Sequence, residues 1–320
     1  MTAAEVPDLT VITVNYNCGS HLLACIEAVF RNTRGLTLEY FVVDNASRPD
    51  GTFETLRANF PQVRLLMSER NLGFAGGCNL ALERGRGRYI LLLNPDTVVG
   101  PSALDRMLAF LDSRRDIGVL GSPLVSGDGR DQRVAGRGFP GPLAALFGRT
   151  TLLTRVFPNN RFSARFSSRR DPDRHEPYEV DWVSGACMMV RREAVADVGM
   201  LDSAYFLMWE DTDWCFRMKR AGWKVYCVHD ADVVHREGAS RNVAWSSLWI
   251  STVAFHKGAY RYYRLHINAR AFHPAHLLVI GALAGRTALL LTTRSIKRIA
   301  RGRPTALVRH RNEDPEPVHR

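Results

Sequence analysis

Short apolar runs alternate with helical patterns over the first 113 residues of the chain. The runs are too short for typical helices and have the continuous apolar character of strands buried on both faces. They are Leu9–Val14, Tyr40–Val43, Val63–Met67 and Tyr89–Leu93. Segments 20–30 and 52–60, and a third that includes 80–82, have helical spacing, and Ser20 is expected to cap the first. This alternation predicts an α/β fold with a mostly parallel sheet flanked by helices.

The second part of the chain is less regular. Residues 126–178 are rich in Gly, Pro, Arg and Ser, and we interpret them as an irregular excursion. Strands are expected over 117–122, within 180–191, and over 224–228 and 232–235. Helices are expected from Arg192 onward, over 209–221, and again after Ser240.

The strand ends carry the candidate chemistry. Asn15, Asp44, Arg70–Asn71 and Asp96 each follow one of the first four strands. Parallel strands place these ends at one edge of a sheet, which is where ligands bind in open α/β folds. The convergence favours a nucleotide site, and Asp96 after Asn94–Pro95 could hold a hard divalent cation against a phosphate. The alternative for each residue is an ordinary turn or a solvated side chain.

Three further features add to this picture. Gly73–Gly77 resembles a phosphate loop but lacks the dinucleotide-binding spacing, so close packing is the preferred interpretation. Glu210, Asp211 and Asp213 lie between Trp209 and Trp214, where burial could prepare one carboxylate as a general base. The alternative is an acid cluster that favours a helix start. His235, at an expected strand end, could ligate the same metal as Asp96, or could be structural.

With these residues in place, the sequence resembles an inverting glycosyltransferase of family two with the A-type fold, within the bacterial rhamnosyltransferase-like group. The matching stretches fall in the family order over about residues 9–240. They are Thr13–Asn17, Val42–Ser47, Asn71–Gly77, Leu93–Asp96, Asp181–Ala186, Glu210–Asp213 and His235–Ser240. Asn94–Pro95–Asp96 stands where the family has Asp-x-Asp, so a metal role for Asn94 is in doubt.

The resemblance implies a nucleotide-sugar donor (dTDP- or UDP-linked, with dTDP-rhamnose the best guess), Mg²⁺ or Mn²⁺, and a glycan or polyprenyl-linked acceptor. Asp211 matches the catalytic base, with Glu210 the second choice, and Asp96 and His235 match the metal ligands. Asp44 would contact the base of the nucleotide. The other donor-binding positions it implies are Thr13, Asn15, Tyr16, Asn45, Arg70, Asn71, Gly73, Phe74, Gly76, Asn79 and Asn94.

We therefore divide the chain into a catalytic domain, 1–240, and a helical, basic C-terminal region, 241–320, with a disordered tail. Within the domain, 1–122 form the nucleotide-binding half and 123–240 the acceptor half. The net charge is +11, and seven Lys and Arg residues with no acid lie between Arg294 and Arg311. This suggests contact with an anionic membrane surface, the alternative being a solvated tail. The apolar run Leu277–Leu291 contains Arg286 and is judged too short and too charged to span a membrane.

Cysteine usage and the N-terminus indicate location. Six scattered cysteines form no Cys-x-x-Cys pair, which is typical of a reduced cytoplasmic chain with buried thiols. The first residues lack the pattern of a signal peptide. We expect a cytoplasmic protein, peripheral at most on the inner membrane face.

Three alternatives remain at this point. A sugar nucleotidyltransferase shares the sheet and metal, but normally has a basic, Gly-rich loop after the first strand, where this chain has Asn15–Gly19. A catalytically dead nucleotide- or glycan-binding module is disfavoured by the intact Asp96, Asp211 and His235. Nucleic-acid binding is suggested by charge alone, and no aromatic-basic motif supports it.

Overall fold

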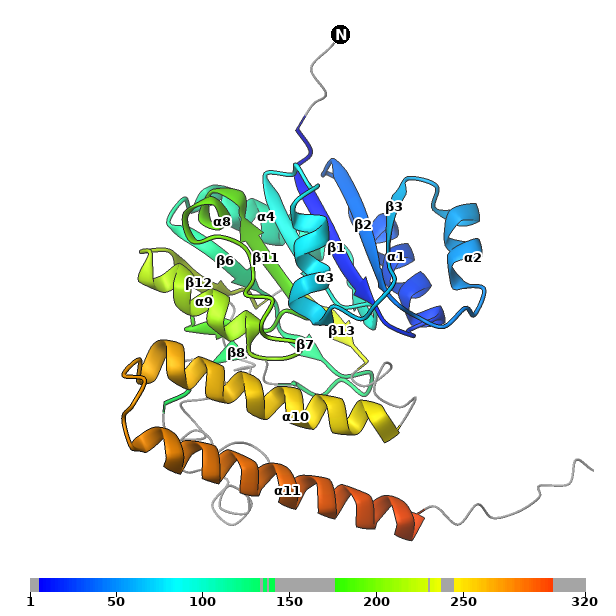
Figure 1. Cartoon of the computed structure of the whole chain (residues 1–320). Helices are drawn as coiled ribbons and strands as arrows, with labels where there is room; N and C mark the ends of the chain where they lie inside the picture. The colour runs from blue at the N-terminus through cyan, green and yellow to red at the C-terminus, as the bar shows by residue number, and fades with distance from the viewer. Residues whose placement is uncertain are drawn as a thin grey trace, which may run out of the picture.

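The computed structural model describes residues 6–132, 135–136, 138–141, 176–229, 231–236 and 245–301 (Figure 1). Most of the predicted irregular segment 126–178 and the tail after residue 301 lie outside these ranges. Of the family motif His235–Ser240, only His235 and Arg236 are described.

An eight-stranded sheet forms the centre of the molecule, in the order β3-β2-β1-β4-β11-β6-β12-β9. The strands are β1 (Leu9–Asn15), β2 (Leu38–Asn45), β3 (Val63–Ser68), β4 (Tyr89–Leu93), β6 (Ile117–Gly121), β9 (Tyr178–Glu179), β11 (Cys187–Arg191) and β12 (Lys224–Cys227). Neighbours pair in parallel except at β11, which is antiparallel to β4 and β6, and at β9, which is antiparallel to β12. The predicted mostly parallel sheet is therefore confirmed.

Strand β11 has the largest effect on the site. It lies between β4 and β6 and runs against both, so its first residue, Cys187, is opposite the last residue of β4, Leu93. The loop before β11 is thereby brought to the carboxyl end of β4. The two predicted halves of the catalytic domain share one continuous sheet, because a strand from the second half is inserted between two strands of the first.

Helices cover both faces of the sheet (Figure 1). On one face lie α1 (Ser20–Asn32), α2 (Thr52–Asn59) and α4 (Ala103–Ser113), and on the other α3 (Gly73–Leu82), α8 (Arg192–Val198) and α9 (Glu210–Arg220). Ser20 does not cap α1, as the sequence suggested. It is the first helical residue, and the capping position is taken by Gly19, whose φ of 49° suits glycine and which provides no side chain to bond the helix.

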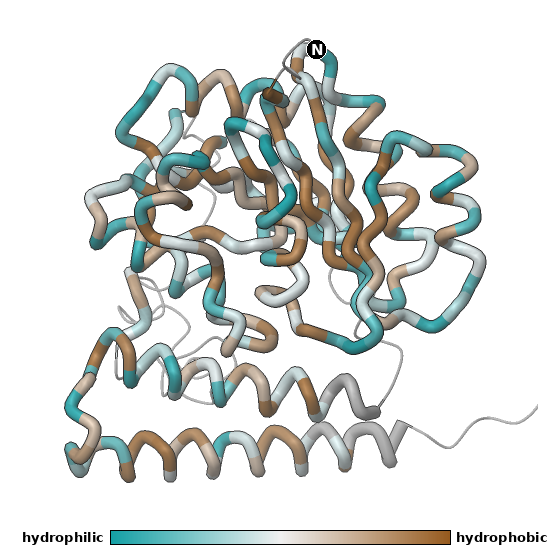
Figure 2. Tube along the Cα trace, turned by 45° about the horizontal axis from the view of Figure 1, so that its top comes forward, coloured by the Kyte–Doolittle hydropathy of each residue, from teal (hydrophilic) through white to brown (hydrophobic). Residues whose placement is uncertain are grey.

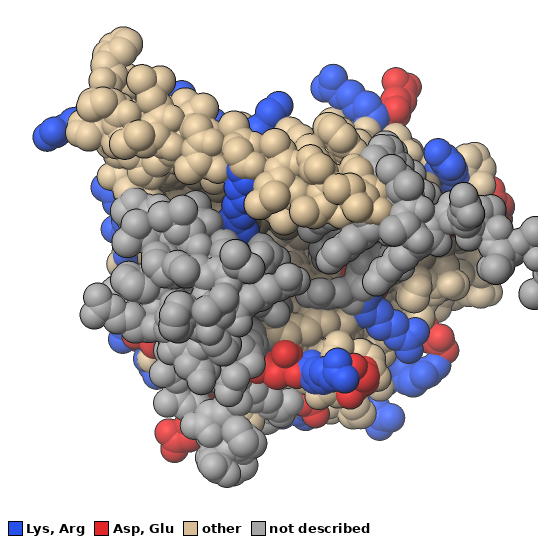
Figure 3. Space-filling view, turned by 90° about the horizontal axis from the view of Figure 1, so that it is seen from below, with Lys and Arg blue, Asp and Glu red and all other residues tan. Residues whose placement is uncertain are grey.

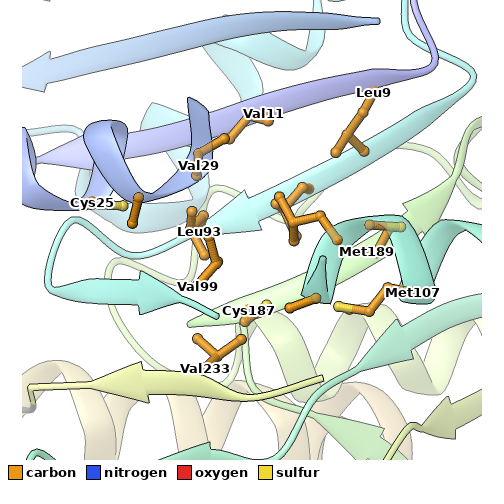
Figure 4. Packing of buried hydrophobic residues seen from close by; sticks show 14 of the residues in the cluster. Leu9, Val11, Cys25, Val29, Leu93, Val99, Met107, Cys187, Met189 and Val233 are labelled. Atoms are coloured by element: carbon orange, nitrogen blue, oxygen red, sulfur yellow. The ribbon is translucent and has the colours of Figure 1, made fainter. Parts of the chain in front are cut away.

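Alternate residues of each central strand enter two separate apolar cores. Val11 of β1 packs with the helices of one face, and Ile12 packs with those of the other. Figure 4 shows part of the first core, where Val29 and Cys25 of α1 meet Leu93 of β4. Such continuous burial explains why the strands have no polar alternation in sequence. All six cysteines are free and buried.

Two small sheets lie beside the main one. β13 (Val233–His235) pairs antiparallel with β5 (Thr97–Val99) and parallel with β7 (Leu124–Val125). β8 (Ala135–Gly136) pairs with β10 (Trp182–Val183). In the first of these sheets His235 is opposite Thr97, the residue after Asp96.

A helical hairpin completes the described structure. α10 (Trp245–Tyr262) leads through a π-helical turn, η1 (Tyr263–Ile267), into α11 (Ala275–Arg301). The hairpin lies below the carboxyl ends of the strands, with α10 against the domain and α11 outermost (Figures 1 and 2). Over Ala275–Thr293, α11 is long and apolar enough to cross a membrane by length and composition, with a mean hydropathy of 1.6. This window is longer than the run Leu277–Leu291 considered in the sequence, and Arg286 is the one Lys, Arg, Asp or Glu among its nineteen residues.

Candidate active site

The carboxyl ends of β1 and β2 form a buried polar cluster. Their register places Asn15 opposite Asp44, and Asn15 Nδ2 donates to Asp44 Oδ1 at 3.2 Å and to Ser47 Oγ at 3.0 Å. Asp44 Oδ2 accepts the backbone N–H of Ser47 at 3.2 Å. Each carboxylate oxygen has room for more than one donor. Asp44 is thus held where it can accept a further N–H group, such as that of a pyrimidine base.

The loop between β3 and α3 is fixed by two amide side chains. Asn45 Nδ2 donates to Asn71 Oδ1 at 3.0 Å and to Gly73 O at 2.9 Å, and its Oδ1 accepts the N–H of Leu72 at 2.9 Å. Asn71 Oδ1 also accepts the N–H of Gly73. Asn45 and Asn71 therefore shape the rim of the site through the backbone they hold.

The glycines of this loop permit close approach, as the preferred interpretation stated. Gly73 has φ +75°, and a Cβ there would lie 2.2 Å from Phe206 O. A Cβ at Gly77 would lie 2.8 Å from Val14 Cγ1, and one at Gly76 would lie 3.0 Å from Leu72 Cβ. The first turn of α3 is consequently pressed against β1 and the 206 loop.

Two of the predicted donor-binding side chains have structural contacts instead. Thr13 is fully buried, and its Oγ1 lies 2.8 Å from the hydroxyl of Tyr40 inside the core. Asn79 lies in the second turn of α3 and donates to Leu201 O at 2.8 Å, which joins α3 to the loop after α8. Tyr16 and Arg70, by contrast, have exposed side chains at the strand-end edge.

Asp96 and His235 meet, although 139 residues separate them in the chain. Asp96 Oδ1 lies 3.2 Å from His235 Nε2, and both side chains are buried. Gln132 Nε2 donates to His235 O at 2.6 Å, and this turns its Oε1 toward His235 Nδ1 at 2.8 Å. The Gln132 carbonyl favours the tautomer with the proton on Nδ1, and in that tautomer the Nε2 lone pair faces Asp96 and the Asn94 amide, 3.4 Å away.

A carboxylate oxygen and an imidazole lone pair side by side suit a divalent cation. The orienting bond from Gln132 is the kind of support that metal-binding histidines have. In the described part of the chain, no group of three or more His, Cys, Asp and Glu side chains is placed to hold a metal. Asp96 and His235 would thus supply two ligands and leave the remaining positions to diphosphate oxygens and water, as Mg²⁺ commonly requires. Asn94 contributes an amide that contacts His235, which fits a supporting role.

The acid cluster opens helix α9. Met208 and Trp209 both have positive φ, 68° and 79°, which is unusual for such side chains and produces a tight turn into Glu210. Asp211 Oδ1 accepts the Thr212 N–H at 2.7 Å, and Oδ2 accepts the Gly185 N–H at 3.1 Å. Burial raises the pKa of Asp211 above its ordinary value, while these bonds oppose the shift.

Glu210 differs from Asp211 in its surroundings. It is buried, and its Oε2 has no hydrogen-bond partner. Burial, with the Asp211 charge adding to it, raises the pKa of Glu210 to about 8. At neutral pH Glu210 therefore holds a proton, whereas the partly exposed and hydrogen-bonded Asp211 is the better proton acceptor.

A short chain of bonds connects the metal-binding pair to the acid helix. The N–H of Asn94 donates to Ala186 O at 3.0 Å, and the preceding residue, Gly185, donates to Asp211. A Cβ at Gly185 would lie 3.1 Å from the ring of Phe74 and 3.8 Å from Asp211 Cβ. The end of β4, the first turn of α3 and the start of α9 are thus neighbours at one edge.

Sequence reasoning missed two supports of this site. Gln132, which orients His235, lies in a segment that the sequence analysis interpreted as irregular. The sole signal in the sequence that could have identified it is its amide side chain, a short distance after β7. Asp213 was noted in the sequence only as a member of the acid cluster, and it is paired with Arg217 Nε at 2.9 Å and His266 Nε2 at 2.6 Å. Burial opposes ionisation of Asp213, yet these two partners bring its pKa below the ordinary value. Asp213 is therefore a structural anchor.

The α/β sheet flanked by helices on both faces is the architecture of the A-type glycosyltransferase fold. The model of the family "Glycosyl transferase family 2" matches residues 10–199, and the chain belongs to this family. The predicted family is confirmed, including its relation to rhamnosyltransferases.

Relatives match over different lengths. The N-acetylglucosaminyl-diphospho-decaprenol L-rhamnosyltransferase of Mycobacterium tuberculosis is 29% identical over 95% of this chain and 99% of its own length. The succinoglycan biosynthesis protein ExoO of Rhizobium meliloti is 34% identical over 41% of this chain and 37% of its own length.

Two solved structures have the same fold. The mannosyltransferase PcManGT from Pyrobaculum calidifontis, in complex with GDP-Man and Mn²⁺, covers 95% of this chain and 77% of its own, with a TM-score of 0.54 and 16% identity. GalNAc-T7 with UDP, GalNAc and Mn²⁺ covers 83% of this chain and 52% of its own, with a TM-score of 0.56 and 14% identity. At these identities the likeness concerns the fold alone.

Proposed function

We propose that this protein is an inverting, divalent-cation-dependent glycosyltransferase that acts in cell-surface polysaccharide synthesis. It transfers a sugar from a nucleotide-sugar donor to a hydroxyl of a polyprenyl-linked glycan, and dTDP-rhamnose is the first donor to test. The near full-length similarity to a rhamnosyltransferase with a decaprenol-linked acceptor supports this choice. The observation that carries the proposal is the Asn94–Ala186 and Gly185–Asp211 contact, which brings Asp96 and Asp211 to one edge.

Asp211 acts as the general base. A sugar hydroxyl is a weak nucleophile, so a positioned carboxylate must accept its proton as the attack begins. The Gly185 and Thr212 N–H groups donate to the two carboxylate oxygens of Asp211 and so fix the orientation of its side chain. Its raised pKa makes it a stronger proton acceptor than a solvated aspartate. Attack from the Asp211 side, opposite the leaving diphosphate, inverts the anomeric carbon.

The opposite side of the site binds the donor. Asp44 accepts a hydrogen bond from the base, and the rim held by Asn45 and Asn71 bounds the nucleotide. Asp96 and His235 would hold Mg²⁺ or Mn²⁺, which when bound neutralises the charge developing on the leaving diphosphate. Holding donor and acceptor in line accounts for a site assembled from several strand ends of one rigid sheet. The six buried thiols fit a reduced, cytoplasmic setting, where nucleotide sugars are supplied.

Replacing the proposed base is the direct test. Asp211→Asn keeps the size of the side chain and its partly exposed position but removes the proton acceptor. We expect the transfer rate to fall about 10²- to 10⁴-fold, while the affinity for dTDP-rhamnose with Mn²⁺, measured by calorimetry beside UDP- and GDP-sugars, stays unchanged.

Asp197→Asn provides the matched control. Asp197 lies on α8 and accepts the Trp223 indole N–H at 2.9 Å, away from the strand-end edge. The same change of charge there should leave transfer intact. Transfer by Asp211→Asn at the wild-type rate would refute the assignment of the base, and absence of binding by every nucleotide sugar would refute the transferase proposal.

A further inference from the structure

The outward face of α11 carries no charged side chain in its apolar stretch. Between Ala275 and Thr293 the sole charged residue is Arg286. The exposed positions are Leu277, Leu278, Ile280, Gly281, Ala282, Ala284, Gly285, Ala288, Leu289, Thr292 and Thr293. Leu278 is 76% exposed, Leu289 is 63% exposed, and Phe272 in the preceding turn is wholly exposed. A helix that faces water along its length normally presents charges on that side.

The inward face of α11 is satisfied by α10, which fixes the orientation of the helix. Leu283 and Leu291 are buried on the inner side, and His276 Nδ1 lies 3.2 Å from the hydroxyl of Tyr260 on α10. The guanidinium of Arg286 lies over the ring of Phe255 at 5.8 Å. The helix therefore already buries one apolar face against α10, and the exposed apolar face is a second, separate face.

Basic residues flank this stretch in the sequence. Residues 238–312 contain thirteen Lys and Arg and no Asp or Glu, which exceeds the net charge of the whole chain, +11. Arg264 and Arg270 precede the apolar stretch, and Lys297 and Arg298 follow it. In the view from below, the described residues include a broad uncharged band, with Lys and Arg within and beside it and some Asp and Glu beyond it (Figure 3). An apolar strip with basic ends is complementary to a bilayer that contains anionic lipid.

We propose that α11 lies flat in the interface of an anionic phospholipid bilayer, with its outer face among the acyl chains and Phe272 as an anchor. The basic flanks select the bilayer over a second copy of this chain, because two such faces would repel each other. Arg286 and Leu283 contact the rest of the hairpin, and a helix that crossed the bilayer would lose these contacts. They therefore favour a helix that lies in the interface. The binding element is thus the apolar face itself, and the basic tail reinforces it.

This orientation has a consequence for the proposed function, on which this step rests. The strand-end edge faces α10, and α11 lies beyond α10 (Figure 1). Two helix layers of about 10 Å each would hold the edge roughly 20 Å from the membrane. The sugar of a diphosphate-linked lipid projects from the surface toward this edge, so the hairpin would set the acceptor distance.

Vesicle flotation of the full chain tests the proposal without any sugar substrate. The vesicles are phosphatidylcholine alone, or equal parts phosphatidylcholine and phosphatidylglycerol. We expect the wild type to float with the anionic vesicles and more weakly with the neutral ones. Leu278→Glu with Leu289→Glu should lower the partition coefficient about tenfold or more for each leucine lost. Both sites are exposed, so folding should be retained, which circular dichroism checks.

Val6→Glu with Met200→Glu is the matched control. It adds the same charges at exposed apolar side chains outside the hairpin, and should float like the wild type. Equal flotation of the α11 variant and the wild type would overturn the proposal. So would a wild type that dimerises in solution and becomes monomeric in the variant, or one that resists alkaline carbonate extraction from membranes. Flotation of a chain that transfers no sugar would refute the proposed function and leave this inference standing.

Discussion

At the scale of single residues, the adjacent acids Glu210 and Asp211 have different surroundings, and this is why we propose different roles for them. Asp211 is reached by two backbone N–H groups and remains partly exposed, so it can ionise and meet a substrate. Glu210 faces inward, with one oxygen that has no partner. The sequence could indicate that an acid in 210–213 is catalytic, but not which one, because the helix rotation and the strained turn at Trp209 decide which side each carboxylate faces.

The buried Glu210 should control how stability depends on pH. Its unfolded pKa is near 4.5 and its folded pKa is about 8, so the folded state binds the extra proton between these values and stability falls as pH rises through them. Glu210→Gln removes this dependence. We expect an unchanged Tm at pH 4.5 and a higher Tm than the wild type at pH 8, measured by calorimetry. Glu83→Gln, at an exposed site, should keep the wild-type slope, and a similar slope in Glu210→Gln would contradict the assignment.

At the scale of elements, the C-terminal hairpin supports the acid helix. Gly258 of α10 packs against the strained turn, where a Cβ would lie 2.8 Å from Trp209 Cδ1. The rings of Trp209 and Tyr262 lie 5.4 Å apart, and Asp202 accepts Arg261 Nε at 2.7 Å. His266 of η1 reaches Asp213, two residues from the proposed base. The hairpin therefore holds the start of α9 in place.

Removing the His266 contact should loosen this support. His266→Ala takes one partner from a buried carboxylate that keeps Arg217, so we expect a loss of about 1–3 kcal/mol in the free energy of unfolding. Denaturant titration measures it, and the transfer rate should fall while donor affinity is kept. Arg264→Ala, at an exposed position on the same turn, should change stability by no more than about 0.5 kcal/mol. Equal losses of unfolding free energy in the two variants would show that the His266–Asp213 pair contributes no more to stability than an exposed side chain does.

At the scale of the whole molecule, the C-terminal hairpin packs against the domain that the sequence predicted to end at residue 240. The hairpin covers Trp209, Phe216 and Asp213, and its own inner face is buried by the domain. The proposed membrane contact and the proposed active site consequently lie on elements that pack against each other. This arrangement would make transfer to an acceptor embedded in vesicles more sensitive to α11 than transfer to a soluble one.

Truncation tests this dependence. A chain that ends at residue 244 should aggregate or unfold at lower temperature, because aromatic surface on α9 is left open to water and Asp213 loses its His266 partner. A chain that ends at residue 301 keeps the hairpin and should unfold like the full protein. Size-exclusion chromatography and thermal unfolding make the comparison. A soluble, cooperatively folded 1–244 chain would show that the domain is independent of the hairpin.

The sequence by itself determined strands β1 to β4 and helices α1 to α3, the polar residues at the strand ends, and the family. The strands, helices and polar ends follow from periodicity and turn residues within short windows, which the chain specifies locally, and the family was indicated by the resemblance of several motifs in a fixed order. The tertiary structure alone decided that β11 inserts antiparallel between β4 and β6, that Gln132 orients His235 across 103 positions, and that His266 secures Asp213. Such contacts depend on how distant segments pack, and no local pattern encodes a partner so far along the chain.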